Sequence, residues 1–218
     1  MKELRNIIIF LGPQGSGKGT QAALLAKRLR LPAISTGALY REEVAKSTRL
    51  GQLARRYIMR GLLAPDEVTS ALVFWRLGER DARRGAVLDG YPRTLGQLEA
   101  FSHIAEVKKV IAVHIPDRAA LKRMAGRRVC SRCEENFHLQ FRPPKKFGVC
   151  DRCGGRLIRR PDDNPAAVKK RLAVYHKNTE PVLALYEKMG LLAEIDGTKS
   201  VAEVARRVWR ALRPKNSK

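Results

Sequence analysis

Residues 12–20 have the types and the spacing of a loop that binds phosphate groups. They read Gly-Pro-Gln-Gly-Ser-Gly-Lys-Gly-Thr and follow a short apolar run at residues 7–11. Glycines allow successive backbone N–H groups to point at an anion, and the N-terminus of the following helix adds partial positive charge. Lys18 would then reach the β- and γ-phosphates of a nucleotide, although Gly19 takes the place usually held by Ser or Thr. The position between a strand and a helix favours this interpretation over a turn that merely joins the two.

The four cysteines of the chain form a second chemical pattern, Cys130-x2-Cys133-x16-Cys150-x2-Cys153. Each Cys-x2-Cys turn can direct two thiolates at one ion, and zinc takes four in a tetrahedron. A complete set of four thiolates leaves no open position, so the metal should be structural. A disulfide framework is disfavoured in a reducing compartment, while a nucleic-acid-binding zinc ribbon stays open for this segment taken alone.

Composition and charge limit the class of protein. The chain has 218 residues, 44% of them hydrophobic, which suits one domain with small insertions or at most two domains. We find no apolar run long enough for a membrane span and no secretory signal, so the expected location is the cytoplasm. Lys and Arg number 44 against 21 Asp and Glu, a net charge of +23 that points to anionic partners or to a heavily solvated surface. The positive charge is spread along the chain, which weakens the case for a dedicated nucleic-acid-binding arm.

Short apolar runs alternate with helical periodicity along most of the chain, which predicts an α/β fold with a doubly wound parallel sheet. The expected strands are residues 7–11, 33–34, 86–88, 110–115 and 192–195. The expected helices are residues 20–30, 37–47, 50–60, 65–81, 94–103, 117–128, 165–188 and 200–212. Residues 35–64 and 129–163 fit this alternation poorly, and we interpret them as insertions at the ligand-binding edge of the sheet.

Residues 12–22 resemble the phosphate loop of adenylate kinases, which also have Gly-Thr-Gln-Ala after the lysine. Further segments resemble the same family in the same order: Ile34-Ser35-Thr36-Gly37 with Arg41, Leu88 to Thr94 with Gln97, Gly126-Arg127-Arg128, Phe137-His138, Arg160 with Asp162-Asp163, Lys170-Arg171-Leu172, and Asp196 to Lys199. The similarity extends over nearly the whole chain. Several independent motifs in order are far more specific than a phosphate loop alone.

The resemblance implies a phosphate-loop kinase core with two insertions. The core would comprise residues 1–34, 65–125 and 164–218. Residues 35–64 would bind the nucleoside monophosphate, and we name them the acceptor insertion. Residues 126–163 would form a small zinc-ribbon-like lid. The implied reaction is reversible transfer of the terminal phosphate of ATP to AMP, giving two ADP, with Mg²⁺ accompanying ATP and zinc held by Cys130, Cys133, Cys150 and Cys153.

The resemblance also assigns individual residues. Those implied to bind ATP are Gly12, Gly15, Ser16, Gly17, Lys18, Gly19, Thr20, Arg123, Arg127, Phe137, His138 and Lys199. Those implied to bind AMP are Thr36, Arg41, Gly90, Arg93, Gln97, Arg160 and Arg171. The implied catalytic set is Lys18, Asp89, Arg93, Arg123, Arg127, Arg160 and Arg171. Guanidinium groups suit bidentate capture of phosphate oxygens.

The chain departs from the family pattern at two places beside Thr36. Ala38 stands where the family usually has an acidic residue that helps to hold the water shell of the metal, which leaves Asp89 as the main carboxylate for that role. Tyr40 stands where a small aliphatic residue is more usual. These departures keep open a kinase of the same architecture that acts on CMP or UMP. The zinc lid and the +23 charge keep open a rival of another class, a nucleic-acid-binding protein. We expect a monomer with no obligatory protein partner and no membrane partner. Incidental binding of nucleic acid to the basic surface stays open.

Overall fold

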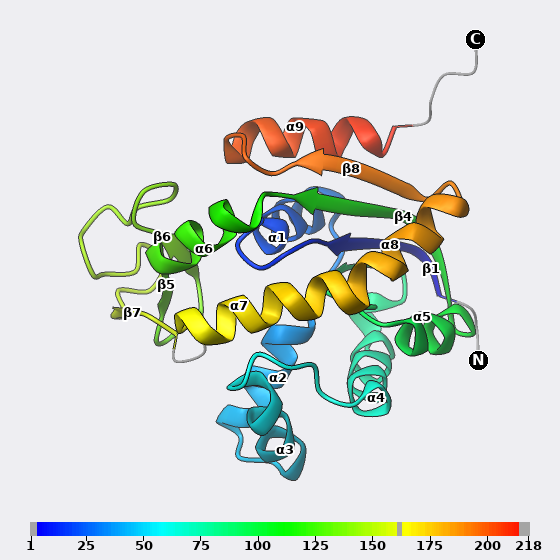
Figure 1. Cartoon of the computed structure of the whole chain (residues 1–218), viewed down its shortest axis with the longest axis horizontal. Helices are drawn as coiled ribbons and strands as arrows, with labels where there is room; N and C mark the ends of the chain where they lie inside the picture. The colour runs from blue at the N-terminus through cyan, green and yellow to red at the C-terminus, as the bar shows by residue number, and fades with distance from the viewer. Residues whose placement is uncertain (1–3, 161–162, 214–218) are drawn as a thin grey trace.

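The computed structural model describes residues 4–160 and 163–213, and a five-stranded parallel sheet lies at its centre (Figure 1). The strand order is β2-β3-β1-β4-β8, which confirms the predicted parallel sheet. The bounds are β1 (Leu4–Leu11), β2 (Ala33–Ser35), β3 (Ala86–Asp89), β4 (Ala105–His114) and β8 (Leu192–Asp196). The apolar runs of the three central strands, β1, β3 and β4, are buried, as expected for strands covered on both faces.

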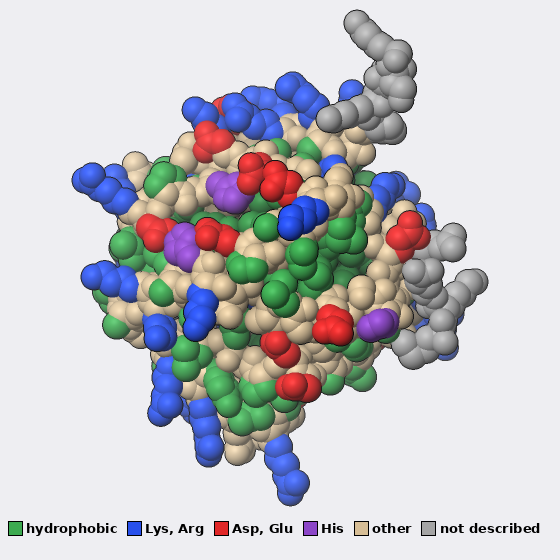
Figure 2. Space-filling model, turned by 45° about the vertical axis from the view of Figure 1, so that its right-hand side comes forward, with side chains coloured by type: hydrophobic (Ala, Val, Ile, Leu, Met, Phe, Trp, Pro, Cys, Tyr) green, Lys and Arg blue, Asp and Glu red, His purple; other side chains and the backbone are tan. Residues whose placement is uncertain are grey.

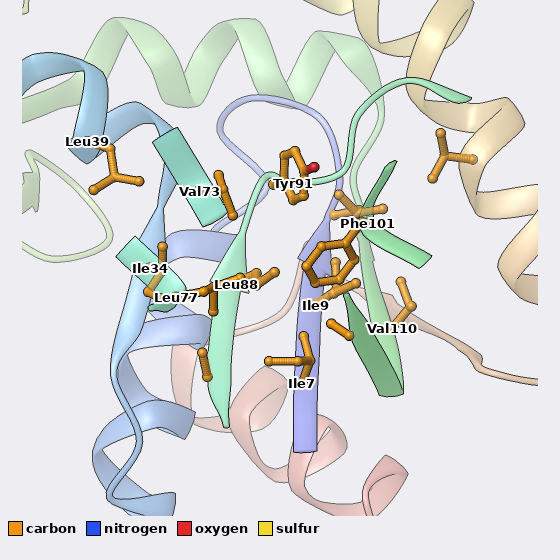
Figure 3. Close-up of a cluster of buried hydrophobic side chains, with 14 of the residues drawn as sticks. Ile7, Ile9, Ile34, Leu39, Val73, Leu77, Leu88, Tyr91, Phe101 and Val110 are labelled. Atoms are coloured by element: carbon orange, nitrogen blue, oxygen red, sulfur yellow. The ribbon is translucent and has the colours of Figure 1, made fainter. Parts of the chain in front are cut away.

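Alternate residues of β1 enter two different cores, one on each face of the sheet. Ile7, Ile9 and Leu11 pack with α4 (Asp66–Leu77), α5 (Leu95–Ser102) and α8 (Glu180–Lys188), in the core shown in Figure 3. Ile8 and Phe10 pack with α1 (Lys18–Leu29) and α9 (Val201–Ala211). Since full burial of one such side chain is worth roughly 1.5–3 kcal/mol, these two cores hold the strand ends in fixed positions.

Two segments project from the sheet (Figure 1). The acceptor insertion contains α2 (Thr36–Ala45) and α3 (Arg49–Ile58). The lid contains a three-stranded antiparallel sheet in the order β6-β5-β7, formed by β5 (Arg127–Cys130), β6 (Asn136–His138) and β7 (Leu157–Ile158). The strands of the lid are too short to have given a periodic pattern in the sequence.

Three predicted helices differ from the structure. The helix expected at 117–128 ends at Gly126, as α6 (Asp117–Gly126), because the next residues pair with β6 in the lid sheet. The helix expected at 65–81 ends with α4 at Leu77, and a 3₁₀ turn (Arg80–Ala82) follows Gly78. The long helix expected at 165–188 consists of α7 (Pro165–Val174), a π-helical turn (Tyr175–Thr179) and α8. A π-helical turn keeps the chain helical but rotates the residues beyond it, which periodicity alone does not reveal.

The carboxyl ends of the parallel strands meet at one edge of the sheet, where ligands of open α/β sheets bind. The phosphate loop follows β1, Thr36 follows β2, Asp89 ends β3, and Gly197 follows β8. The parallel register pairs Phe10 of β1 with Asp89, and Ser35 of β2 with the same Asp89. Residues that are far apart in sequence therefore come together at this edge.

Lys and Arg side chains are distributed over the molecular face shown in Figure 2 and do not gather in a single patch there, consistent with the spread of the +23 charge along the chain. Asp and Glu side chains lie among them on the same face. Among the described residues, no helix combines the length and the apolar character needed to cross a membrane.

Candidate active site

A single cavity of about 640 Å³ lies at this edge of the sheet, between the core, the acceptor insertion and the lid. All of the residues that the sequence assigned to nucleotide binding or catalysis line it. They are Gly12, Gly15, Ser16, Gly17, Lys18, Gly19, Thr20, Thr36, Arg41, Asp89, Gly90, Arg93, Gln97, Arg123, Arg127, Phe137, His138, Arg160, Arg171 and Lys199. Asp162, a part of the family motif, lies outside the described residues.

The phosphate loop has a close neighbour in Asp89. A Cβ atom at Gly19 would lie 2.9 Å from Asp89 Oδ2, so the glycine at this unusual position gives the carboxylate room beside the loop. Asp89 Oδ1 is buried and makes no hydrogen bond to any residue that the structure describes. A buried carboxylate oxygen without a partner costs free energy unless a ligand satisfies it. Oxygen ligands and water shells are what Mg²⁺ prefers, so this carboxylate is suited to the metal that accompanies ATP.

Lys18 is partly buried at the start of α1. Its Nζ donates a hydrogen bond to the carbonyl oxygen of Pro13 at 3.2 Å. Burial lowers the pKa of Lys18 to about 8, an effect that Asp89 opposes and that Arg93 and other nearby arginines reinforce. A bound polyphosphate would favour the charged form and raise this pKa again.

We therefore expect nucleotide binding above pH 8 to take up a proton at Lys18. In the ligand-free protein this lysine, with a pKa of about 8, is mostly neutral at pH 9, whereas the complex with ATP requires the ammonium. The affinity for Mg·ATP should fall up to about tenfold per pH unit between pH 8 and 10. Titration calorimetry at pH 9 in two buffers of different ionisation enthalpy should report close to one proton taken up.

Lys18→Met should abolish this proton uptake, whereas Lys27→Met, at an exposed position of the same helix, should leave it unchanged. Equal affinity for Mg·ATP at pH 7 and pH 9.5 in the unmodified protein would contradict the expectation.

Arg93, another residue of the cavity lining, is held by backbone and side-chain oxygens. Its Nε donates to the carbonyl oxygen of Gly90 at 2.6 Å, and its Nη2 donates to Thr36 Oγ1 at 3.2 Å. Gly90 has φ 77°, and a Cβ atom there would lie 2.3 Å from Arg93 Nη2, so only glycine allows this approach. Burial lowers the pKa of Arg93, but a guanidinium keeps its charge in proteins.

Two hydrogen bonds fix the orientation of the Gln97 carboxamide, one to a group that only accepts and one from a group that only donates. Its Nε2 donates to the carboxylate of Asp66 at 2.8 Å, and its Oε1 accepts from the backbone N–H of Arg93 at 2.8 Å. A carboxylate only accepts and a backbone N–H only donates, so the amide cannot be reversed without losing both bonds. One N–H and one oxygen lone pair of Gln97 remain for a ligand.

Asp66 is a site residue that sequence reasoning missed. It also accepts a hydrogen bond from Thr94 Oγ1 at 2.7 Å, so it holds the N-terminus of α5 as well as Gln97. The signal in the sequence is weak, because an acidic residue in the first turn of a helix is common for reasons of helix stability alone. The hydroxyl of Tyr40, also in the cavity lining, is bonded to Thr69 Oγ1 at 2.7 Å, which explains how the chain accommodates this larger residue.

Further arginines of the cavity lining surround a buried carboxylate. Asp163 is 1% exposed, and Arg127 Nε donates to its Oδ2 at 2.7 Å, with a second contact from Arg127 Nη2 to Oδ1. Arg171 Nη1 lies 3.8 Å from Asp163 Oδ1 and donates to the Gln14 side chain at 3.1 Å. Arg123 donates to the carbonyl oxygens of Gly15 and Ser16, which brings it against the phosphate loop. These bonds hold the arginines in place in the absence of phosphate.

His138 stands at the edge of the cavity with both ring nitrogens engaged. Its Nδ1 accepts from the backbone N–H groups of Gln140 and Phe141, so its Nε2 donates to the carbonyl oxygen of Arg123 at 3.0 Å. Burial lowers the pKa of His138, which favours this neutral form. The Phe141 ring lies 4.6 Å from the His138 ring, and the Arg123 guanidinium lies 5.0 Å from Phe141. Phe141 was missed by sequence reasoning, and with His138 it offers flat surfaces for a nucleobase.

The four cysteine sulfurs lie within 4.8 Å of one another in the lid and could hold a metal ion. Cys130 and Cys153 Sγ are 3.4 Å apart, and Cys133 and Cys150 Sγ are 3.6 Å apart. Bonded sulfurs would be about 2.05 Å apart, whereas four sulfurs about 2.3 Å from one tetrahedral ion would be about 3.8 Å apart. The backbone N–H groups of Arg132 and Arg152 point at Cys130 and Cys150 Sγ, as donors around metal-bound thiolates do.

The parallel sheet and the phosphate loop define a phosphate-loop nucleotide-binding protein, and further arginines line the same cavity as the loop. A family model described as adenylate kinase matches residues 10–191. The adenylate kinase of Caldicellulosiruptor bescii is 45% identical over 210 residues, which cover 94% of this chain and 98% of the relative. That of Streptomyces coelicolor is 46% identical over 212 residues, with 94% and 98% covered, and that of Staphylococcus aureus is 43% identical over 206 residues, with 92% and 96% covered.

The chain therefore belongs to the adenylate kinase family, a class of phosphotransferases that interconverts ATP plus AMP with two ADP. The resemblance noted in the sequence is confirmed at the level of the family, of the fold and of this reaction. The roles of individual residues stay predictions.

Proposed function

We propose that Lys18 and the phosphate loop hold the phosphates of Mg·ATP while Arg41 and Arg93 hold the phosphate of AMP, so that the two nucleotides meet end to end. The observation that carries this proposal is that one cavity is lined both by the loop and by Arg41, Arg93, Arg123, Arg127, Arg160 and Arg171. The transferring group carries spread negative charge in its transition state, and positioning and electrostatic stabilisation supply most of the catalysis.

The reaction needs no general base, because the acceptor oxygen belongs to a phosphate that is already ionised. The remaining requirement is to keep water from accepting the phosphate instead of AMP. The lid and the acceptor insertion line the cavity from two sides, and their closure over bound nucleotides would serve this purpose. Mg²⁺ bound with ATP would neutralise phosphate charge, with Asp89 holding its water shell.

The proposed division into units follows the same logic. Residues 1–34, 65–125 and 164–218 would form the rigid core, residues 35–64 the mobile acceptor insertion, and residues 126–163 the lid. The lid would be held by structural zinc on Cys130, Cys133, Cys150 and Cys153, because four thiolates at these separations match the size and geometry of a closed zinc site.

The fixed amide of Gln97 supports adenine as the acceptor base. The N–H and the lone pair that remain to Gln97 match a base edge that presents a ring-nitrogen acceptor beside an amino donor, as adenine N1 and N6 do. Cytosine presents the same pair on a smaller ring, whereas guanine and uracil present a protonated ring nitrogen beside a carbonyl. Asp66 and the Arg93 N–H prevent Gln97 from turning to suit the second pattern.

We expect AMP to be the preferred acceptor, with kcat/KM for GMP and UMP lower by about 10³-fold and for CMP by a smaller factor. The measurement is ADP formation from Mg·ATP with each monophosphate offered separately, with a no-acceptor control. Gln97→Ala should reduce the preference for AMP over GMP, because the amide pattern is removed.

A preference for another monophosphate would be consistent with the proposed mechanism of phosphate transfer but would contradict the selection of adenine by Gln97. Absence of acceptor-dependent turnover from folded, zinc-loaded protein would contradict the proposal and direct attention to the basic surface.

A further inference from the structure

An ion pair connects the lid to the acceptor insertion. Arg41 Nε, on α2, donates to Glu134 Oε2, in the turn after β5, at 3.0 Å. The two side chains come from segments 93 residues apart in sequence. Arg41 is the guanidinium that the proposed function assigns to the AMP phosphate, so a carboxylate of the lid already contacts the group that an incoming phosphate needs.

The backbone at Glu134 gives independent evidence that this side chain has a role. Glu134 has φ 55°, in the left-handed region that glycine adopts at little cost and that costs other residues about 1 kcal/mol. Glu134 follows Cys133 in this turn, and the backbone N–H of Glu134 donates to the carbonyl oxygen of Cys130 at 3.1 Å. Glycine would satisfy the turn without strain, whereas Glu134 adopts this backbone conformation at a cost while its side chain reaches Arg41.

We propose that Glu134 acts as an internal anion that competes with the AMP phosphate for Arg41, and so tunes acceptor affinity. This inference rests on the proposed function of Arg41. A phosphate arriving at Arg41 meets a carboxylate on the same guanidinium, and the two negative charges repel each other. The pair is partly exposed, with Arg41 and Glu134 side chains 30% and 53% accessible, so the competition is modest and depends on salt.

The test is equilibrium binding of AMP, measured by titration calorimetry, together with steady-state kinetics. We expect Glu134→Gln to lower Kd and KM for AMP by about two- to fivefold at low ionic strength, with KM for Mg·ATP unchanged. The gain should shrink in 0.5 M salt. Glu134→Gly should give a similar gain in AMP affinity and should also raise Tm, because the left-handed backbone is then unstrained.

Glu135→Gln is the matched control. It makes the same charge change at the next residue, but Glu135 pairs with Arg142 and Arg152 inside the lid and not with Arg41. It should leave AMP affinity unchanged within twofold. In an Arg41→Ala background, the effect of Glu134→Gln should disappear, since the pair acts through that guanidinium.

Two results would overturn the inference while leaving the proposed function intact: AMP binding unaltered by Glu134→Gln, or AMP binding weakened by it. The second result would mean that the pair supports closure and does not compete with the substrate. Failure of the unmodified protein to bind AMP, or to form ADP from it, would instead refute the proposed function and this inference with it.

Discussion

Replacing Arg93 with alanine should lower kcat/KM for AMP by about 10³-fold while leaving the fold intact. Arg93 is held by Gly90 and Thr36 so that its guanidinium lines the cavity. A pre-organised cation in a cavity shielded from water stabilises charge that develops on the transferring phosphate without reorganising during the reaction, and loss of such a donor typically costs 10²–10³ in rate. Steady-state kinetics with AMP and Mg·ATP varied separately would measure the loss.

The stability of the variant is the more discriminating measurement. The charge of Arg93 helps to lower the pKa of Lys18, and burial lowers the pKa of both groups. Removing one cation relieves repulsion and offsets the loss of two hydrogen bonds worth about 1 kcal/mol each. We therefore expect Tm to change by no more than a few degrees.

Arg83→Ala, at an exposed position outside the cavity lining, is the matched control and should change neither activity nor Tm appreciably. If Arg93→Ala retained activity within threefold of the unmodified protein, Arg93 would not be part of the catalytic machinery. If Tm instead collapsed together with activity, the role of Arg93 would be structural.

The sequence predicted the strands and the phosphate loop well because these features depend on local patterns. The apolar run from Ile7 to Leu11 has to be a buried strand, and the glycines and Lys18 that follow it have to form a loop at its carboxyl end. The arginines lining the cavity could be assigned because they occur in motifs whose order matches a family.

The partners of polar side chains could not be predicted, because they depend on segments that meet only in the folded chain. Asp66 and Gln97 are 31 residues apart, and nothing near either residue in the sequence indicates their hydrogen bond. The same holds for Arg41 and Glu134. From periodicity alone, the helix at residues 117–128 was predicted to continue beyond Gly126. The structure ends it there because Arg127 and Arg128 pair with β6, a long-range contact that overrides local helix preference.

Removal of zinc from the lid should lower Tm by roughly 5–15 °C, because the lid has little else to hold it together. Its buried core consists of Cys130, Phe137, Cys150 and Leu157, so two of its four members are proposed zinc ligands. Its strands are at most four residues long. Sheets of this size are marginal in water without a metal or a larger core.

The measurement compares zinc-loaded protein, chelated protein and chelated protein restored with zinc. Thermal melts should show the loss and its recovery, and metal analysis should give one zinc per chain. Cys153→Ser should reproduce the chelated state, while Ser131→Ala, a substitution inside the same knuckle that removes no thiolate, should melt close to the unmodified protein.

Activity separates a structural metal from a catalytic one. A structural zinc predicts that activity at low temperature, while the lid is still folded, stays within a few-fold of that of the loaded protein and falls as the lid melts. Four thiolates on one zinc would fill its tetrahedral positions and would leave none for a substrate oxygen. If chelation left Tm unchanged and abolished phosphate transfer with the lid folded, zinc would have to act in the chemical step, and the structural role would be wrong.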